Sequence, residues 1–136
     1  MSDVAERMIG NRAVVTRVMR AATGRRNAEL AAGAVRSEPV AVGAMATAAL
    51  VRVCGTLLDG DDPASWSVVL KVVHSPDRSP VWALIPPEFQ AVTLQGIRWR
   101  TEPDVYRSAL PQLLPAGLRM PVIYDIDEID DATTAI

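Results

Sequence analysis

The hydrophobic pattern at the start of the chain predicts helices. Apolar residues between positions 3 and 22 recur at three- and four-residue intervals, with arginines between them, which is the period of an amphipathic helix. The Gly-Asn pair at 10–11 is expected to break this stretch into two helices, and the Thr-Gly pair at 23–24 to end it. Residues 25–35 are expected to add a further helical turn or two.

After residue 36 the pattern changes to short extended runs that are rich in valine and leucine. Segments 38–42, 50–58 and 66–74 are each predicted to be strands. The last two flank the sequence Asp-Gly-Asp-Asp-Pro at 59–63, which is a strong turn signal. An antiparallel meander of three strands is the simplest arrangement of these segments.

Prolines divide the region that follows. Residues 75–98 contain four of them, so any helix there is expected to be short or interrupted. A further helix is predicted around Thr101, because Thr101 and Asp104 have the spacing of a capping box and Pro103 is tolerated in a first helical turn. Pro111 should kink or end this helix near the residue before it.

Two more strands are predicted at the C-terminal end. Residues 122–128 alternate between apolar and polar positions, a turn is expected at 130–131, and 132–136 have the composition of another strand. The expected fold class is therefore α+β, with N-terminal helices and a five-stranded antiparallel sheet across which one helix packs. A chain that stops inside a strand, rather than in a polar linker, is expected to be cut from a larger fold.

The composition is that of one domain with unevenly distributed charge. The chain has 136 residues, 49% of them hydrophobic, which is enough to bury a core. The net charge is −2, but residues 1–36 carry seven arginines and three acids, whereas residues 100–136 carry three arginines and seven acids. Such asymmetry can mark an end that faces nucleic acid or a membrane. Solvated helix faces and turns are the commoner cause, and we favour that interpretation.

Several kinds of site and location are disfavoured by the residues that the sequence lacks. One cysteine and one histidine allow neither an intramolecular disulfide nor a cysteine-rich zinc site. No apolar run approaches the roughly 20 residues that a membrane span requires. The N-terminus also lacks the layout of a secretory signal. We therefore expect a cytoplasmic protein without a membrane partner.

The single lysine of the chain is the most informative residue. Lys71 lies in the most hydrophobic of the predicted strands, whereas the other thirteen strongly basic residues are arginines. Lysine offers a compact ammonium and arginine a planar fork, so the two are not equivalent at a phosphate or a carboxylate. An ammonium among valines is also costly to bury unless an anion pairs with it. The alternative is a lysine on the solvent face of a half-buried strand.

The order of the predicted elements resembles the smaller lobe of the protein-kinase-like fold, in which a lysine on a strand pairs with a glutamate on a helix. The segment 69–73 (VLKVV) is similar to the lysine strand of aminoglycoside phosphotransferase-like kinases, and 99–108 (WRTEPDVYRS) resembles the start of their glutamate helix. The loop 114–121 and the strand 124–128 are similar to the segments that follow. The resemblance runs from about Pro39 to the C-terminus.

The resemblance implies that residues 37–136 form a nucleotide-facing kinase lobe, truncated at the hinge, after a helical segment at 1–36. ATP and Mg²⁺ are the implied cofactors. Lys71 would hold the α- and β-phosphates, and Glu102 would orient Lys71 through an ion pair. The loop over the triphosphate would be formed by Gly43, Ala44, Met45, Ala46 and Thr47. The alternatives are a first-turn acid favoured by the helix dipole for Glu102, and an ordinary hairpin turn for the loop.

The implied parent activity is ATP-dependent phosphorylation of a small-molecule hydroxyl. In this family a second lobe supplies the catalytic Asp, an Asn and a metal-holding Asp, and nothing in the sequence resembles its H-G-D…N loop. We therefore expect no catalytic residue and no metal ligand in this chain, and no turnover by the chain alone. A missing C-terminal lobe or a partner chain is expected on the exposed hinge side.

Two other functions stay open. One is a non-catalytic protein-interaction domain, in which the sheet face beside the missing lobe and the apolar tail at 132–136 would bind a partner. The other is a basic helical module on residues 7–26 that binds nucleic acid in a salt-dependent way. We regard the nucleic-acid module as the least favoured of the three functions.

Overall fold

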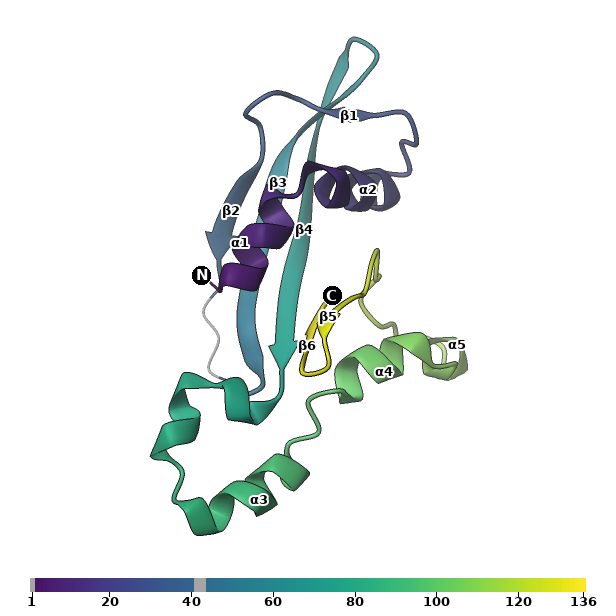
Figure 1. Cartoon of the computed structure of the whole chain (residues 1–136). Helices are drawn as coiled ribbons and strands as arrows, with labels where there is room; N and C mark the ends of the chain where they lie inside the picture. The colour runs from purple at the N-terminus through teal and green to yellow at the C-terminus, as the bar shows by residue number, and fades with distance from the viewer. Residues whose placement is uncertain (1, 41–43) are drawn as a thin grey trace. The chain divides into compact units, whose positions relative to one another are not determined.

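The computed structural model describes residues 2–40 and 44–136 (Figure 1). The chain divides into two compact units. The first consists of Met1–Val42 and Ala49–Val72, and the second of Gly43–Ala48 and Val73–Ile136. Both strands of one long hairpin contribute residues to each unit.

Two helices begin the first unit, as the N-terminal pattern predicts. α1 (Asp3–Gly10) and α2 (Arg12–Thr23) meet at Asn11, whose side chain accepts hydrogen bonds from the first backbone N–H groups of α2. Gly24 has a φ of 70° and ends α2 in the left-handed conformation, which glycine adopts without strain. The predicted break and the predicted end are both confirmed.

The helical turns expected in residues 25–35 are wrong. This stretch forms turns and the short strand β1 (Glu29–Leu30), which pairs antiparallel with residues 57–58. The cause is tertiary, because two backbone carbonyls of the stretch accept hydrogen bonds from α2. Arg20 Nε lies 2.8 Å from the oxygen of Ala28, and Arg12 Nη2 lies 2.9 Å from the oxygen of Leu30.

The central hairpin confirms two of the predicted strands. β3 (Thr47–Asp59) and β4 (Asp62–His74) contain the expected segments 50–58 and 66–74, and each is several residues longer. They are joined at Gly60, whose φ of 63° suits the first central position of a tight hairpin turn. The turn predicted within residues 59–63 is therefore confirmed.

The sheet agrees with the expected antiparallel class and has one more strand than expected. In the described residues its order is β1–β3–β4–β6–β5, and β2 (Arg36–Pro39) also pairs with β3. β5 (Asp127–Asp130) and β6 (Thr133–Ala135) form a short antiparallel hairpin. The sheet is thus five strands wide, because β1 and β2 share one edge of β3.

The core of the first unit lies between its helices and one face of the hairpin. The buried helical side chains are Ala5, Val15 and Met19, and Figure 1 shows α1 and α2 passing over β3 and β4. From the strands come Val51, Val53, Leu57 and Trp66. Full burial of side chains as large as Met19 and Leu57 stabilises a fold by about 1.5–3 kcal/mol each.

Short helices begin the second unit, as its prolines predict. η1 (Pro76–Arg78) and η2 (Pro80–Leu84) are 3₁₀ turns, and α3 (Pro87–Gly96) is the longest helix of the described part of this unit. Each of the three has proline in its first turn, where the missing N–H is not needed.

The helix that carries Glu102 differs from its prediction in two details. α4 (Thr101–Arg107) begins at the expected residue, but Arg100 occupies the N-cap position in a helical conformation and no side chain caps the helix. The predicted capping box is therefore wrong, because a capping side chain needs an extended N-cap residue. α4 also ends before the expected place, and Pro111 instead lies in the first turn of α5 (Leu110–Leu113).

The predicted strand at 122–128 is wrong over most of its length. Only Asp127 and the residues after it pair, in a register that joins Asp127 to Ala135. Residues 121–126 have no regular structure. An alternating pattern alone does not make a strand, because a strand needs a partner opposite it. The strand predicted at 132–136 is confirmed as β6.

Gly55 on β3 leaves room for no side chain. A Cβ atom built on it would lie 2.7 Å from the backbone oxygen of Ala34 and 3.1 Å from Nε1 of Trp66. This indole N–H is buried and has no hydrogen-bond partner in the described part of the chain. The backbone near Ala34 and the indole ring therefore both pack directly on Gly55.

We expect Gly55→Ala to destabilise the protein by about 1–3 kcal/mol, since the added methyl group overpacks a rigid site. Urea unfolding measures the change. Gly10→Ala is the matched control, because a Cβ atom there meets nothing within 4 Å and alanine favours a helix. An equal effect of the two substitutions would contradict the close packing at Gly55.

Candidate functional site

Lys71 lies on β4 in the first unit and is half-buried. Side chains alternate between the faces of a strand, so Lys71 shares a face with Ser67 and Val69, both of which are exposed. The opposite face carries the buried Trp66 and Val72. Lys71 therefore lies on the face opposite to Trp66 and Val72, where its neighbour Val73 is buried as well.

A second cation lies on the same face. Arg52 of β3 is exposed, and its Nε donates to Oγ of Ser67 at 2.9 Å. Ser67 and Lys71 are two alternations apart on β4, so both cations belong to one side of the hairpin. Arg52 offers a matched comparison for the charge of Lys71.

Glu102 is half-buried and is the second residue of α4, in the second unit. Asp104 follows it in the same first turn, where the partial positive charge of the helix N-terminus favours carboxylates. An acid that is favoured at this position only by the helix dipole would lie in the same place. Lys71 and Glu102 belong to different units, and the ion pair between them stays a prediction.

The predicted phosphate loop is attached to the end of β4. Gly43 lies outside the described residues, and Ala44, Met45, Ala46 and Thr47 form the turn that leads into β3. The backbone N–H of Thr47 donates to the oxygen of Ala44 at 3.1 Å. An ordinary turn and a ligand-covering loop both agree with this geometry.

His74 holds this turn in place. Its backbone N–H donates to the oxygen of Ala46 at 3.0 Å, and its ring Nε2 lies 3.1 Å from the oxygen of Met45. The His74 side chain is buried. Sequence reasoning missed this function, because the two partners of His74 lie almost thirty residues before it along the chain.

An ion pair connects η1 to the hairpin of β5 and β6. Arg78 Nη1 lies 2.8 Å from Oδ2 of Asp130 and 3.1 Å from the hydroxyl oxygen of Thr133. The other carboxylate oxygen of Asp130 accepts from the backbone N–H of Ala132 at 2.9 Å. The Ala132 N–H and then the Arg78 guanidinium hold the pKa of Asp130 below its ordinary value.

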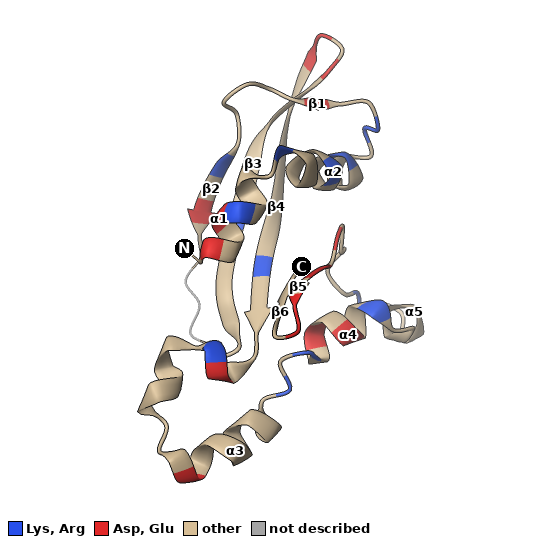
Figure 2. Ribbon diagram, viewed as in Figure 1, with Lys and Arg blue, Asp and Glu red and all other residues tan. Residues whose placement is uncertain are grey.

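The uneven charge of the sequence is visible along the fold. Figure 2 shows basic positions along α2 and acidic positions on α4 and β5.

Among the described residues, His, Cys, Asp and Glu side chains do not gather in groups of three that could hold a metal ion. We assign no metal-dependent step to these residues. Within residues 2–40 and 44–136, no helix is long and apolar enough to cross a membrane.

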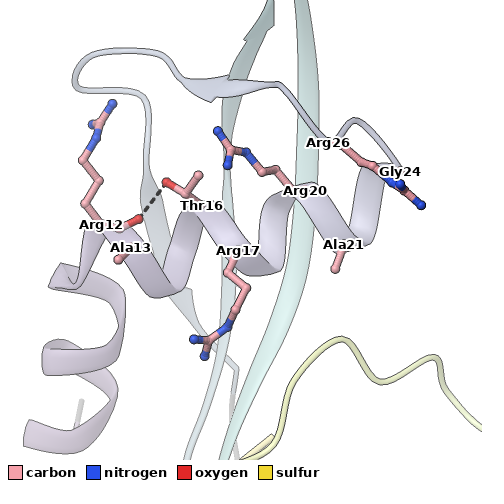
Figure 3. Close-up of a pocket in the computed structure, with 8 residues that line it drawn as sticks. All are labelled: Arg12, Ala13, Thr16, Arg17, Arg20, Ala21, Gly24 and Arg26. Carbon is pink, nitrogen blue, oxygen red and sulfur yellow. Dashed lines mark hydrogen bonds between the residues drawn. The ribbon is translucent and has the colours of Figure 1, made fainter.

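An open groove of about 980 Å³ lies along α2, and we call it the α2 groove (Figure 3). Four arginines and four small residues line it, all of them from α2 or from the few residues after it. Its lining consists of Arg12, Ala13, Thr16, Arg17, Arg20, Ala21, Gly24 and Arg26. The groove belongs entirely to the first unit.

No protein-family model, curated protein or solved structure matches this chain. The helices and the antiparallel sheet alone define its fold class, which is mixed α and β. The resemblance to aminoglycoside phosphotransferase-like kinases rests on the motifs around Lys71 and Glu102, and it stays a prediction.

The lowered pKa of Asp130 has a consequence for stability. A carboxylate whose pKa is lower in the folded state stabilises the fold above its unfolded pKa and loses this effect as the pH falls through the folded pKa. We expect Asp130→Asn to be less stable than the unchanged protein at neutral pH. The difference should shrink as the pH falls below the ordinary range of carboxylates.

Thermal unfolding between neutral and acidic pH measures this difference. Asp61→Asn is the control, because Asp61 lies in the exposed turn between β3 and β4 and its substitution removes the same charge. A difference for Asp130→Asn that is the same at every pH would show that the carboxylate charge does not stabilise the hairpin.

Proposed function

We propose that this chain is the nucleotide-binding lobe of an aminoglycoside phosphotransferase-like kinase, which transfers phosphate from ATP to a hydroxyl group of a small molecule. The observation that carries the proposal is the position of Lys71. The only lysine of the chain is half-buried on a long strand, on the face opposite to the buried Trp66 and Val72. A buried core or a fully exposed turn would not suit a phosphate-binding ammonium.

The order of the neighbouring elements supports the proposal. The turn of residues 44–47 precedes β3, the lysine strand follows β3, and α4 with Glu102 comes next. In protein-kinase-like lobes the same order brings a covering loop, a lysine and a glutamate to one nucleotide.

The chemistry assigned to each side chain follows from its charge. The Lys71 ammonium binds the α- and β-phosphates as a compact point charge on a flexible stem. The carboxylate of Glu102 holds the lysine side chain in the binding rotamer. A pair in a partly dry site contributes more than an exposed pair, which is worth ~0–1 kcal/mol.

The turn of residues 44–47 covers the phosphates in this proposal. Small side chains such as Ala44 and Ala46 let backbone N–H groups approach an anion. The hydrogen bonds from His74 to Met45 and Ala46 keep the turn against the end of β4. A fixed turn loses less conformational entropy when it binds a ligand than a free loop does.

Mg²⁺ would accompany the nucleotide, where it neutralises phosphate charge. The residues described here bind and orient the nucleotide in the proposal, and the base and the metal-holding carboxylate belong to a second lobe. The proposal therefore concerns binding by this chain, and phosphate transfer by the whole kinase.

A protein-interaction domain is the second candidate, and the exposed apolar side chains of the second unit favour it. No residue of η2 or α3 is buried, and Leu84, Val92 and Leu113 are 80%, 61% and 73% exposed. Exposed apolar patches on a protein often mark interaction sites. A purely interacting domain would not bind nucleotide, so a nucleotide titration separates the two candidates.

We expect the unchanged chain to bind a non-hydrolysable ATP analogue, followed by tryptophan fluorescence, and Lys71→Met to bind it about 10- to 100-fold more weakly. A hydrogen bond to a charged group is worth about 1.5–3 kcal/mol, and about 1.4 kcal/mol corresponds to a factor of ten.

Arg52→Met is the matched control, because it removes one positive charge from the same face of the hairpin. We expect this variant to keep its affinity. Equal binding by Lys71→Met and the unchanged chain would remove the function assigned to Lys71. No binding by any version would favour the interaction domain.

A further inference from the structure

α3 is a helix that its own chain leaves almost uncovered. None of its ten residues, all of which the structure describes, is buried, and the apolar Phe89 and Val92 are 55% and 61% exposed. A helix of this length is marginal in water, because most helical stability in proteins comes from the packing of an apolar face. A second surface that packs on α3 would therefore stabilise it.

Three residues of α3 share one exposed face. Phe89, Val92 and Gly96 are three and four residues apart, so they follow one another along one side of the helix. The half-buried Gln90 and Thr93 mark the neighbouring side, which is turned toward the rest of the chain. A Cβ atom built on Gly96 meets nothing within 4 Å. The exposed face thus has an aromatic ring at one end, a valine at its middle and an open space at the other end.

The charges at the two ends of this surface are opposite. Glu88 is the only charged residue between positions 80 and 97, and Arg98 directly follows that segment. Both side chains are exposed. A partner that matches this surface is apolar at its middle, with a cation opposite Glu88 and an anion opposite Arg98. A second copy of α3 that runs in the opposite direction has this pattern.

The spacing of the residues suits such an antiparallel pair. If the two copies cross at Val92, Glu88 is four residues before the crossing and Arg98 of the other copy is six residues after it. With a rise of ~1.5 Å per residue, the two charged residues lie about 3 Å apart along the helix axis. Phe89 of one copy comes beside the open space at Gly96 of the other. The antiparallel direction also brings the positive end of each helix dipole to the negative end of its partner.

We propose that this chain forms a two-fold symmetric dimer in which α3 of one copy packs antiparallel on α3 of the other. A two-fold dimer uses the same patch on both copies, so the patch must be complementary to itself, and the apolar face and end charges of α3 are. One short helix from each copy makes a small interface, so the dimer is weak and depends on concentration. The proposal does not depend on the nucleotide site at Lys71.

Sedimentation velocity of the whole chain, from about 1 μM to 1 mM, tests the proposal. We expect the unchanged chain to shift from monomer to dimer within this range. Val92→Glu places two carboxylates at the crossing point, and like charges in an interface are strongly unfavourable. We expect this variant to raise the dissociation constant by a factor of at least ~100.

Val122→Glu is the matched control, because Val122 is another valine of the second unit, is 71% exposed and lies outside α3. It adds the same charge and should dimerise as the unchanged chain does. The circular dichroism of both variants is recorded alongside, so that a loss of helix is recognised.

The end charges provide a second test that a folding defect cannot imitate. Glu88→Arg and Arg98→Glu should each weaken the dimer, because each brings like charges together at both ends of the interface. An equal mixture of these two variants should associate again, since every end contact between them joins opposite charges.

Three results would overturn the proposal. One is an unchanged chain that stays monomeric over the whole range, and another is an equal effect of Val92→Glu and Val122→Glu. The third is a mixture of the two charge variants that associates no better than either alone. A monomeric chain whose Val92→Glu variant loses binding to phosphatidylcholine vesicles would assign the face of α3 to a lipid surface, and would overturn the proposal as well.

Discussion

The pairing of β3 with β4 is the constraint on which the rest of the structure depends. β1 and β2 both pair with β3, β6 lies next to β4 in the sheet, and the core of the first unit packs on one face of the hairpin. The same pairing decides the side on which Lys71 lies. A slip of one residue in β4 would exchange its two faces, which would turn Lys71 into the core and Trp66 out of it. The register of this hairpin therefore fixes both the stability of the first unit and the chemistry proposed for it.

Local signals predicted the elements that local interactions stabilise. Asn11 and Gly24 bound the helices as their residue types suggest, and Gly60 closes the hairpin. The failures have tertiary causes. Residues 25–35 have a helical composition, but two arginines of α2 bind their carbonyls and leave a short strand. Residues 122–126 alternate like a strand, yet in the observed register only the residues from Asp127 onward face a partner. Propensity is a weak guide wherever such long-range bonds decide the conformation.

The candidate site residues also divide into those that a local sequence signal reveals and those that only long-range contacts reveal. Lys71 stands out in the sequence because its residue type is unique in the chain, and Glu102 because it lies in a recognisable motif. Other contacts have no such signal in the sequence. His74 bonds to the turn before β3, which is distant in the sequence. Arg12 and Arg20 bond to backbone carbonyls near β1. No residue pattern encodes a bond to a backbone carbonyl, because every residue has one. The α2 groove was thus visible in the sequence only as a cluster of charge.

The most direct test of the account is a double-mutant cycle on nucleotide affinity, with Lys71→Met, Glu102→Gln and the combination of both. Residues that contact one another give non-additive free energies, with interaction terms of about 0.5–3 kcal/mol. If Glu102 orients Lys71, the glutamate substitution should weaken binding in the unchanged chain and have almost no effect once the lysine is gone. Additive losses, or a loss from Glu102→Gln that is as large without the lysine as with it, would contradict the pairing of the two residues.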